Sequence, residues 1–396
     1  MESNVFPRLK FNMMHSLPKF NSIVKALTGA LALCLGQAAS AAEVVPYFHS
    51  WGGSLVDAKQ SVGMNSAMLS FATTNGSCAL VPDLTNKLAD ARNYVAAGGR
   101  LLISFGGAHG VYAEIACKND DQLFNLMEKL MSDANTRRFD YDIEGHQLKD
   151  EEGTARRARV LARLQAKYPD LYISISLPGW LRGFDQNSMN LLNTTVAAGV
   201  RIDMVNVMAQ SFGVDNLRTM VSPSTVGEAS LMTFRAAAKQ MTSVFRNKTQ
   251  GELYAMMGIS PMIGKNDDGS TFTLDDAYTV ANFAKQNGVG IISYWSFQRD
   301  RAQSNNGSTN LGAYSGVAQS DFQFYNIFKT SGGAVNAPTA QAPASGGSCN
   351  ASNWSEGKQY AAGSIVSYSN RTYIAKFYNP GYNPTISTYY WSQYAC

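Results

Sequence analysis

Short apolar runs alternate with longer segments of helical periodicity along most of the chain. The runs have the composition of β-strands and begin at Val44, Ser66, Leu101, Arg138, Leu171, Asp203, Leu253 and Gly290. Between most of them lie helical patterns, for example over residues 151–168 and 274–288. Strands that alternate with helices in this way predict an α/β fold, a (β/α)8 TIM barrel over residues 43–329. A doubly wound open sheet is the alternative, but no glycine-rich phosphate loop marks its first crossover.

The composition changes after Lys329. Residues 330–348 are rich in Gly, Ala, Ser, Thr and Pro and lack charged and aromatic side chains, which predicts a flexible linker. Residues 349–396 form a short unit crowded with aromatic residues. A unit of this size can build only a small core of its own. We therefore expect a small all-β module closed by a disulfide, with several aromatic rings exposed.

The first 42 residues have the pattern of a secretory signal peptide. Four basic residues, Arg8, Lys10, Lys19 and Lys25, precede an apolar run from Ala26 to Gly36 and then a series of small residues. We expect cleavage after Ala41 or Ala42 and a secreted, extracellular protein without membrane contact. A lipoprotein signal ending at Cys34 is the alternative, although Leu33 is bulky where a small residue is typical.

Four cysteines would remain after cleavage, and a secreted chain with four cysteines is expected to form disulfides. Their clustering along the sequence favours Cys78 with Cys117 and Cys349 with Cys396, one pair per domain. No Cys/His cluster has the spacing of a zinc site. We therefore expect neither a metal nor a cofactor.

Charged residues make up 16% of the chain, and the formal net charge is +4. No basic block is present of the kind that binding to nucleic acid requires. We expect a monomer with no nucleic-acid partner.

Three acids occupy alternate positions in the expected fourth strand, within the stretch RRFDYDIEGH. They are Asp140, Asp142 and Glu144, and the residues between them are Phe139, Tyr141 and Ile143. Residues two apart on a strand share a face, so the acids would line the barrel interior. Glu144 would stand nearest the carboxyl end, where barrel enzymes gather their catalytic residues. Crowded carboxylates raise at least one pKa, and a protonated glutamate near neutral pH suits general acid catalysis.

Two other interpretations of the three acids stay open at this point. They could lie on the solvated face of an edge strand. They could also ligate a hard cation, although no further acids cluster nearby in the sequence.

The neighbouring motifs narrow the interpretation of the three acids. SFGG (Ser104–Gly107) precedes them by one helix, and YWSF (Tyr294–Phe297) ends the eighth expected strand. Together these segments resemble glycoside hydrolase family 18, the chitinases. VPYFHSW, FDYDIEGHQLKD, VNVMAQSFG and PMIGKNDD are similar to a bacterial and fungal branch of that family, and the resemblance covers residues 43–329.

The resemblance implies a role for each acid. Glu144 would protonate the glycosidic oxygen and later activate water. Asp142 would turn toward the 2-acetamido group, whose oxygen attacks the anomeric carbon to give an oxazolinium ion, so the reaction would retain the anomeric configuration. Asp140 would share a proton with Asp142 and orient it.

The resemblance also implies the surroundings of the acids. Trp295 would stack under the sugar; the alternative is a plain core tryptophan. Ser104 and Tyr47 would support the acids, while Gly106 and Gly107 would keep the barrel mouth open to the sugar. On the sixth expected strand, the interior positions are Asn206, Met208 and Gln210.

The sixth strand departs from the family pattern. The branch usually has an aspartate beside the substrate acetamido group, but this chain has Gln210 and Ser211 there. Gln210 could donate an N–H, whereas Ser211 cannot supply a charge. One lost charge-assisted hydrogen bond is worth about 1.5–3 kcal/mol, which would slow an enzyme without abolishing it. A chitin-binding, lectin-like relative therefore stays an alternative, as does an endo-β-N-acetylglucosaminidase. Arg137 also stands where the family has an outer aspartate.

The C-terminal unit resembles carbohydrate-binding modules of family 5/12, which implies binding of chitin or chito-oligosaccharides. The register places Phe377 and Tyr378 where those modules have two tryptophans. We expect a chitin-binding face built from Tyr378, Tyr382, Phe377 and Trp391, with a core role for Trp391 as the alternative. A module for insoluble polymer favours a chitinase over an enzyme for glycoproteins, and a protein-interaction module is the remaining alternative. The segment between MIGKNDD and YWSF has no room for the extra α/β insertion that walls off deep clefts in other branches, and the open cleft that this implies favours endo action.

Overall fold

The computed structural model describes residues 42–213, 225–303 and 310–330, and much of the C-terminal unit between residues 351 and 394. Within that unit it describes residues 351–356, 358–361, 363–369, 371–375, 379, 381, 383–384 and 390–394. The expected signal peptide, apart from Ala42, and the expected linker, apart from Thr330, lie outside the described residues. So do Cys349, Cys396, Phe377, Tyr378 and Tyr382.

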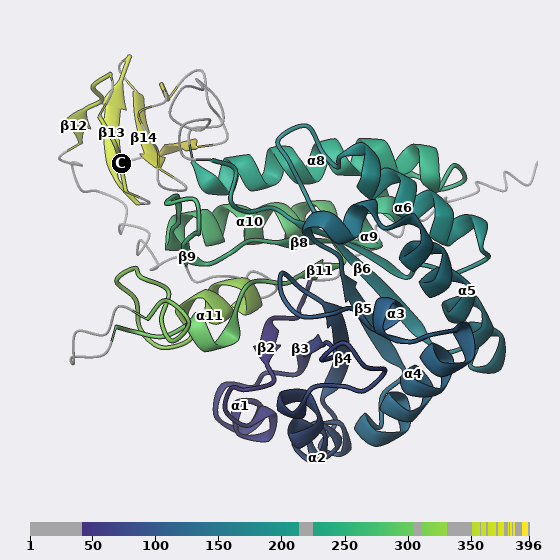
Figure 1. Cartoon of the computed structure of the whole chain (residues 1–396). Helices are drawn as coiled ribbons and strands as arrows, with labels where there is room; N and C mark the ends of the chain where they lie inside the picture. Colours follow the sequence, from purple (N-terminus) through teal and green to yellow (C-terminus); the bar gives the residue numbers. More distant parts are fainter. Residues whose placement is uncertain are drawn as a thin grey trace, which may run out of the picture. The chain divides into compact units, whose positions relative to one another are not determined.

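Nine parallel strands curl into a barrel (Figure 1). They are β1 (Glu43–Val44), β2 (Tyr47–His49), β3 (Ser66–Ala72), β4 (Arg100–Gly106), β5 (Arg138–Asp142), β6 (Tyr172–Pro178), β7 (Met204–Met208), β8 (Met257–Ser260) and β11 (Ile291–Ile292). Every expected strand overlaps an observed strand, and the first one is split into β1 and β2. The start expected at Leu253 is wrong by four residues, because residues 253–255 end α9 and β8 begins only at Met257. The predicted barrel is confirmed.

The split first strand closes the barrel. β1 pairs with β11, whereas β2 pairs with β3. Pro46 lies between the two parts and has no N–H to donate, but its carbonyl still accepts from the Met68 N–H at 2.9 Å. Tyr47 N–H continues the pairing toward the carbonyl of Tyr294 at 3.1 Å. One strand therefore holds both edges of the sheet together.

Helices cover the outside of the strands (Figure 1). They are α1 (Leu55–Val62), α2 (Pro82–Ala96), α3 (Ala113–Ala116), α4 (Asp120–Ala134), α5 (Glu151–Lys167), α6 (Gln186–Ala197), α8 (Val226–Val244), α9 (Gln250–Ala255), α10 (Leu274–Asn287) and α11 (Gln323–Thr330). Two 3-10 turns, η1 (Gly145–Lys149) and η2 (Phe297–Arg299), and a hairpin of β9 (Gly264–Lys265) and β10 (Thr271–Phe272) complete this domain. No helix among the described residues combines the length and the apolar character needed to cross a bilayer.

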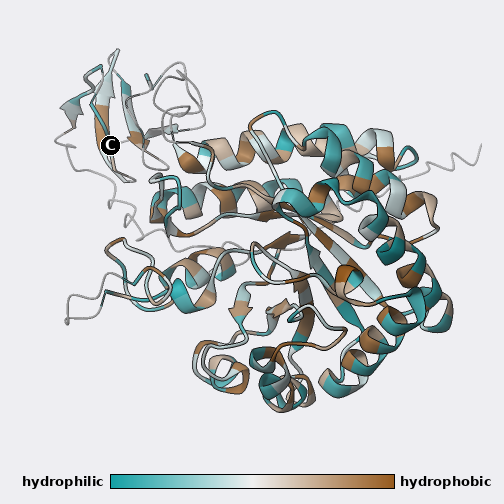
Figure 2. Cartoon of the chain, viewed as in Figure 1, coloured by the Kyte–Doolittle hydropathy of each residue, from teal (hydrophilic) through white to brown (hydrophobic). Residues whose placement is uncertain are grey.

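Helix α4 illustrates why these segments are helical. The Asn119 side chain caps its start by accepting from the Gln122 N–H at 2.9 Å, and Asn135 ends it in the left-handed conformation. Its buried residues are Leu123, Met127, Leu130, Met131 and Ala134. This spacing of three and four places one apolar stripe toward the strands. Figure 2 shows the resulting alternation of hydrophobic and hydrophilic residues along the outer helices.

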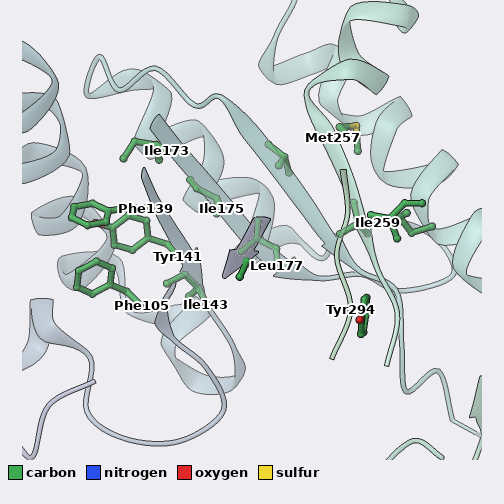
Figure 3. Close-up of a cluster of buried hydrophobic side chains, with 14 of the residues drawn as sticks. Phe105, Phe139, Tyr141, Ile143, Ile173, Ile175, Leu177, Met257, Ile259 and Tyr294 are labelled. Atoms are coloured by element: carbon green, nitrogen blue, oxygen red, sulfur yellow. The ribbon is translucent and has the colours of Figure 1, made fainter. Parts of the chain in front are cut away.

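The barrel has an outer core between strands and helices and an inner core inside the strands. Phe139, Tyr141 and Ile143 belong to the outer core, as expected, and are fully buried (Figure 3). Tyr141 stacks on Phe105 of β4 with a centroid distance of 5.1 Å. The inner core consists of Val45, Tyr47, Met68, Leu102, Met204 and Ile291. The residues between Phe139, Tyr141 and Ile143 must therefore face the barrel interior.

The C-terminal unit is a small four-stranded sheet, and its predicted all-β class is confirmed. Its strands pair in the order β12 (Ser352–Asn353), β13 (Ile365–Tyr368), β14 (Arg371–Ala375), β15 (Trp391–Tyr394). The expectation that Trp391 belongs to an exposed binding face is wrong, because this side chain is only 2% exposed. Trp391 packs edge-on against Tyr360 at 5.4 Å, in a core that a unit of this size can fill with few residues.

Candidate active site

The carboxyl end of β5 places the three acids at increasing exposure. Asp140 is 0% exposed and Asp142 is 3% exposed, and both lie within the strand. Glu144 is half-buried and stands two residues beyond the strand, at the start of η1. The Ile143 N–H still donates to the carbonyl of Ser176 at 3.1 Å, so strand-like pairing extends to the residue before Glu144. The acids therefore rise from the barrel interior to its mouth.

Asp140 is held by hydroxyl groups from three other strands. Ser104 on β4 donates to its Oδ2 at 2.7 Å, and Ser176 on β6 donates to its Oδ1 at 2.8 Å. The Tyr47 hydroxyl lies 3.5 Å from Oδ2. Ser104 and Tyr47 were expected beside the acids. Burial raises the pKa of Asp140, while these hydroxyl donors oppose that rise.

The hydrogen bonds continue across the barrel interior. Asn206 on β7 donates to the Ser176 hydroxyl at 3.0 Å, and Ser293, directly after β11, donates to the Asn206 side-chain oxygen at 3.1 Å. Both residues are fully buried. We name Ser293, Asn206, Ser176, Asp140 and Ser104 the interior hydrogen-bond chain. Ser176 and Ser293 were not expected, although both occupy interior positions of strands that the sequence predicts.

Asp142 lies in a different environment. Its Oδ1 is buried and has no hydrogen-bond partner among the described residues. Burial raises the pKa of this carboxyl well above its ordinary value, and the nearby charges of Glu144 and Asp140 raise it further. A carboxyl of this kind retains a proton or turns toward an incoming positive charge or N–H donor.

Glu144 also favours its protonated form. Burial raises the pKa of its carboxyl; His109 lowers it and Asp267, in the hairpin between β9 and β10, raises it. His109 and Asp267 were not identified from the sequence, because each lies in a loop distant from Glu144 along the chain. A carboxyl at the barrel mouth with a raised pKa is better suited than an ordinary glutamate to donate a proton to a bound molecule.

An aromatic group adjoins the acids. Trp295 follows β11 and is half-buried. Its ring stacks with that of Phe71 at a centroid distance of 5.6 Å and lies 4.7 Å from the ring of His49. Tyr47, which contacts Asp140, lies 5.9 Å from the Trp295 ring. The fold thus brings the expected tryptophan to the same interior layer as the acids. Phe71 and His49 were missed.

The structure gives a reason for Gly106 and Gly107 that the sequence did not indicate, and the expected clearance for a sugar stays a prediction. Both have positive φ, 97° and 84°. A Cβ on Gly106 would lie 2.1 Å from the Asp142 carbonyl oxygen, and one on Gly107 would lie 2.6 Å from the Phe71 ring. A side chain at either position would therefore collide with the protein itself, and Gly106 permits β4 to approach the acid-bearing strand.

Strand β7, the sixth strand expected from the sequence, carries the expected interior residues. Asn206 and Met208 are buried within it, and Gln210 lies half-buried beyond its end. The Gln210 Oε1 has no hydrogen-bond partner among the described residues. Ser211 has a left-handed backbone with φ 51°, and its N–H donates to Asn266 at 3.3 Å. The departure from the family pattern therefore lies at the barrel mouth.

A disulfide joins the expected pair, Cys78 and Cys117. It links the loop after β3 to the end of α3, in the connection that follows β4. Among the described residues, no group of three or more His, Cys, Asp or Glu side chains is arranged to hold a metal ion.

Comparisons with known proteins agree with this geometry. Residues 353–392 match the family model of carbohydrate-binding module family 5/12. The chain is 31% identical over 222 residues to the probable bifunctional chitinase/lysozyme of Escherichia coli (strain K12), covering 54% of this chain and 24% of that protein. It is 30% identical over 211 residues to Endochitinase 11 of Metarhizium anisopliae, covering 52% and 40%. The matches thus span less than half the length of either relative.

The fold also matches a solved structure. Catalytic site mutants of active domain 2 of the thermostable chitinase from Pyrococcus furiosus, complexed with chito-oligosaccharides, superpose with a TM-score of 0.63. The sequence identity is 26%, and the match covers 75% of this chain and 97% of that one.

Proposed function

We propose that this chain is a glycoside hydrolase family 18 chitinase joined to a family 5/12 carbohydrate-binding module, and that it hydrolyses the β-1,4 bonds between N-acetylglucosamine units. The observation that carries the proposal is the row of acids in β5. It combines one carboxylate saturated with hydrogen bonds, one that lacks a partner at Oδ1 and one at the mouth with a raised pKa.

The chemistry assigns a different step to each acid. Glu144 gives its proton to the glycosidic oxygen, so the leaving sugar departs as a neutral alcohol. The acetamido oxygen of the remaining sugar attacks the anomeric carbon. Asp142, which passes its proton to Asp140 and so becomes ionised, stabilises the positive charge of the oxazolinium ion beside it. Glu144, now ionised, takes a proton from water, which opens the ring with overall retention. Asp140 shares a proton with Asp142 in this scheme, so it sets the charge that Asp142 carries at each step.

The test compares the predicted mature chain, residues 43–396, with its Glu144→Gln variant on a hexamer of N-acetylglucosamine. NMR would follow the lengths and anomers of the products. We expect β-anomeric short oligomers from the unaltered chain and a loss of about 10²–10⁴-fold in the variant, the contribution typical of general acid–base catalysis. Glu128→Gln on the outer face of α4 is the matched control and should cleave normally.

The main alternative is a chitin-binding relative with little hydrolysis. Ser211 favours it, because this residue supplies no carboxylate at the mouth. If the unaltered chain binds the hexamer but leaves it intact, the chitinase proposal fails and this alternative stands. Cleavage of N-linked glycans instead of the hexamer would indicate an endo-β-N-acetylglucosaminidase.

We further propose that the module holds the barrel on insoluble chitin outside the cell. A tether raises the local concentration of substrate without new catalytic contacts. The N-terminal basic and apolar pattern and the Cys78–Cys117 disulfide support secretion. N-terminal sequencing of the protein from the culture medium would test this, and an uncleaved intracellular chain would contradict it.

A further inference from the structure

The mechanism does not use Tyr112, yet this residue contacts the backbone on both sides of the acids. It lies between β4 and α3 and is 3% exposed. Its hydroxyl oxygen is 3.0 Å from the Gly107 carbonyl oxygen and 3.0 Å from that of Asp142, and it accepts from the Glu144 N–H at 3.1 Å. A tyrosine hydroxyl has one proton to donate and can also accept, so these contacts use its whole capacity.

The hydroxyl sits where the regular strand pairing stops. The register between β4 and β5 ends at Gly106 opposite Asp142, and one more bond runs from the Gly107 N–H to the Asp142 carbonyl at 2.8 Å. The Glu144 N–H lies beyond this end, and it donates to the Tyr112 hydroxyl. A side chain from another segment thus continues the ladder to the residue that carries the proposed general acid.

The segment that carries Tyr112 is itself anchored in several ways. Val111 pairs with Thr74, in the loop after β3, through N–H···O bonds of 2.9 and 3.4 Å. The Cys78–Cys117 disulfide joins the same two segments. Glu114 in α3 forms an ion pair with Arg157 of α5, and both side chains are only 3% exposed.

The neighbouring Arg156 completes this attachment to α5. It donates to the carbonyl oxygens of Glu114 and Cys117 at 3.0 and 2.7 Å. Tyr112 is therefore fixed to the barrel wall independently of the acids, so it can act as a reference point for them.

We propose that Tyr112 is a positioning residue that holds the backbone of Glu144, and through it the carboxyl, at the barrel mouth. The hydroxyl contacts backbone groups of the acid-bearing segment, so its effect on turnover passes through Glu144. The catalytic part of this inference rests on the proposed chitinase function; the positioning part does not.

The variant Tyr112→Phe removes the hydroxyl and keeps the ring. Without its partner, the Glu144 N–H turns toward water and the carboxyl loses part of the burial that raises its pKa. We expect kcat to fall about tenfold with KM within about twofold, the size of one lost hydrogen bond. The alkaline limb of the kcat/KM profile should move to lower pH, because the protonated acid is lost earlier.

Other ionisable groups also act on Glu144 and stay unchanged in this variant. They are Asp142 on β5, Tyr47 on β2, His109 after β4 and Asp267 between β9 and β10. The matched control is Tyr94→Phe. Tyr94 is a fully buried tyrosine of α2, and its hydroxyl donates to the Met64 carbonyl at 2.9 Å, on the outer side of the barrel. The Tyr94→Phe variant should leave the pH profile of kcat/KM unshifted.

A titration that does not need turnover separates this inference from the proposed function. The Glu144 carboxyl carbon can be followed by NMR in glutamate-labelled protein and assigned by its absence in Glu144→Gln. We expect a lower Glu144 pKa in Tyr112→Phe than in the unaltered chain and no change in Tyr94→Phe. A chain that cleaves no chitin but shows this shift would refute the function and keep the positioning role.

An unshifted titration in a folded Tyr112→Phe variant, or an equal shift in Tyr94→Phe, would overturn the proposal. If Tyr112→Phe does not fold, the double variant Cys78→Ser, Cys117→Ser provides the same test. It loosens the Tyr112 segment from a distance, so we expect a smaller shift in the same direction. An unshifted Glu144 in that variant would also refute the role.

Discussion

Asp140 and Asp142 lie two residues apart on the same strand and are almost equally buried, yet their hydrogen bonding differs. Both oxygens of Asp140 accept hydrogen bonds from serine hydroxyls of neighbouring strands. Asp142 has a buried oxygen without a partner among the described residues. Burial raises the pKa of both, but only Asp140 has hydroxyl donors on both oxygens that oppose the rise.

This difference shows that burial alone does not define a reactive carboxyl. A buried carboxyl with donors on both oxygens is a fixed structural element, whereas one with an unpaired oxygen can still gain stabilisation from a ligand. The same strand therefore carries one carboxyl, Asp140, that is fixed by hydrogen bonds and another, Asp142, that can still interact with a ligand. Each of the following changes tests one side of this contrast.

Asp142→Asn should have the largest effect on activity. The amide keeps the shape but removes the negative charge that stabilises the oxazolinium ion, so we expect kcat to fall about 10²–10³-fold on the hexamer. The protein should be at least as stable as before, because a poorly solvated carboxyl has been made neutral. Steady-state kinetics and thermal unfolding of the same samples would measure both effects.

The pH dependence of unfolding gives a second readout of the same variant. The pKa of Asp142 is raised in the folded state, so its contribution to the free energy of unfolding is fully present below the ordinary value of about 3.9 and is lost as pH rises through the raised value. The unaltered chain should therefore lose stability relative to Asp142→Asn as pH increases. Asp121→Asn on the exposed face of α4 should show no such trend; a parallel course for both variants would contradict the argument.

Asp140→Asn should lower stability more, and activity less, than Asp142→Asn does. Its amide nitrogen cannot accept from a serine hydroxyl, so one buried hydrogen bond is lost and the free energy of unfolding should fall by about 1–3 kcal/mol. Activity should fall by a smaller factor than in Asp142→Asn, because Asp140 acts on the sugar only through its neighbour. Urea unfolding would measure the stability, and a variant as stable as Asp142→Asn would refute the contrast.

Ser293→Ala should have the smallest effect. It removes the donor at the far end of the interior hydrogen-bond chain and leaves the Asn206 oxygen without that donor, at a cost of about 1 kcal/mol in unfolding free energy. Activity should stay within about twofold. Ser188→Ala is the matched control, because this buried hydroxyl has no hydrogen-bond partner among the described residues and should cost less. An equal loss of unfolding free energy in both variants would show that the Ser293 end of the interior hydrogen-bond chain adds no stability.

The fold could be predicted largely because its signals are local. Each strand is a short apolar run, each helix has its own period, and the alternation of acids with Phe139, Tyr141 and Ile143 identifies the interior face of β5. The Cys78–Cys117 pair was also accessible, since the two cysteines lie near each other in the sequence. The roles assigned to Asp140, Asp142, Glu144 and Trp295 remain predictions until the variants are measured.

The contacts that set the properties of the acids could not be predicted in the same way. Tyr112 and Asp267 come from loops, and no local period indicates that they reach Glu144. The close approach of Gly106 to the Asp142 carbonyl could not be predicted either, because it exists only after β4 and β5 pair. Trp391 was misassigned because an excess of aromatic residues does not tell which rings fill a small core.

The interior hydrogen-bond chain has a direction: Ser293 donates to Asn206, Asn206 to Ser176, and Ser176 to Asp140. Asn206 and Ser176 each accept a hydrogen bond from one neighbour and donate one to the next, and the series ends at an oxygen of the Asp140 carboxyl, which accepts. A single replacement such as Asn206→Asp would set two acceptors against each other in a fully buried space. A change that turns a donor of this chain into an acceptor therefore requires a compensating change on a neighbouring strand, which couples β7 and β6 to the acid-bearing strand.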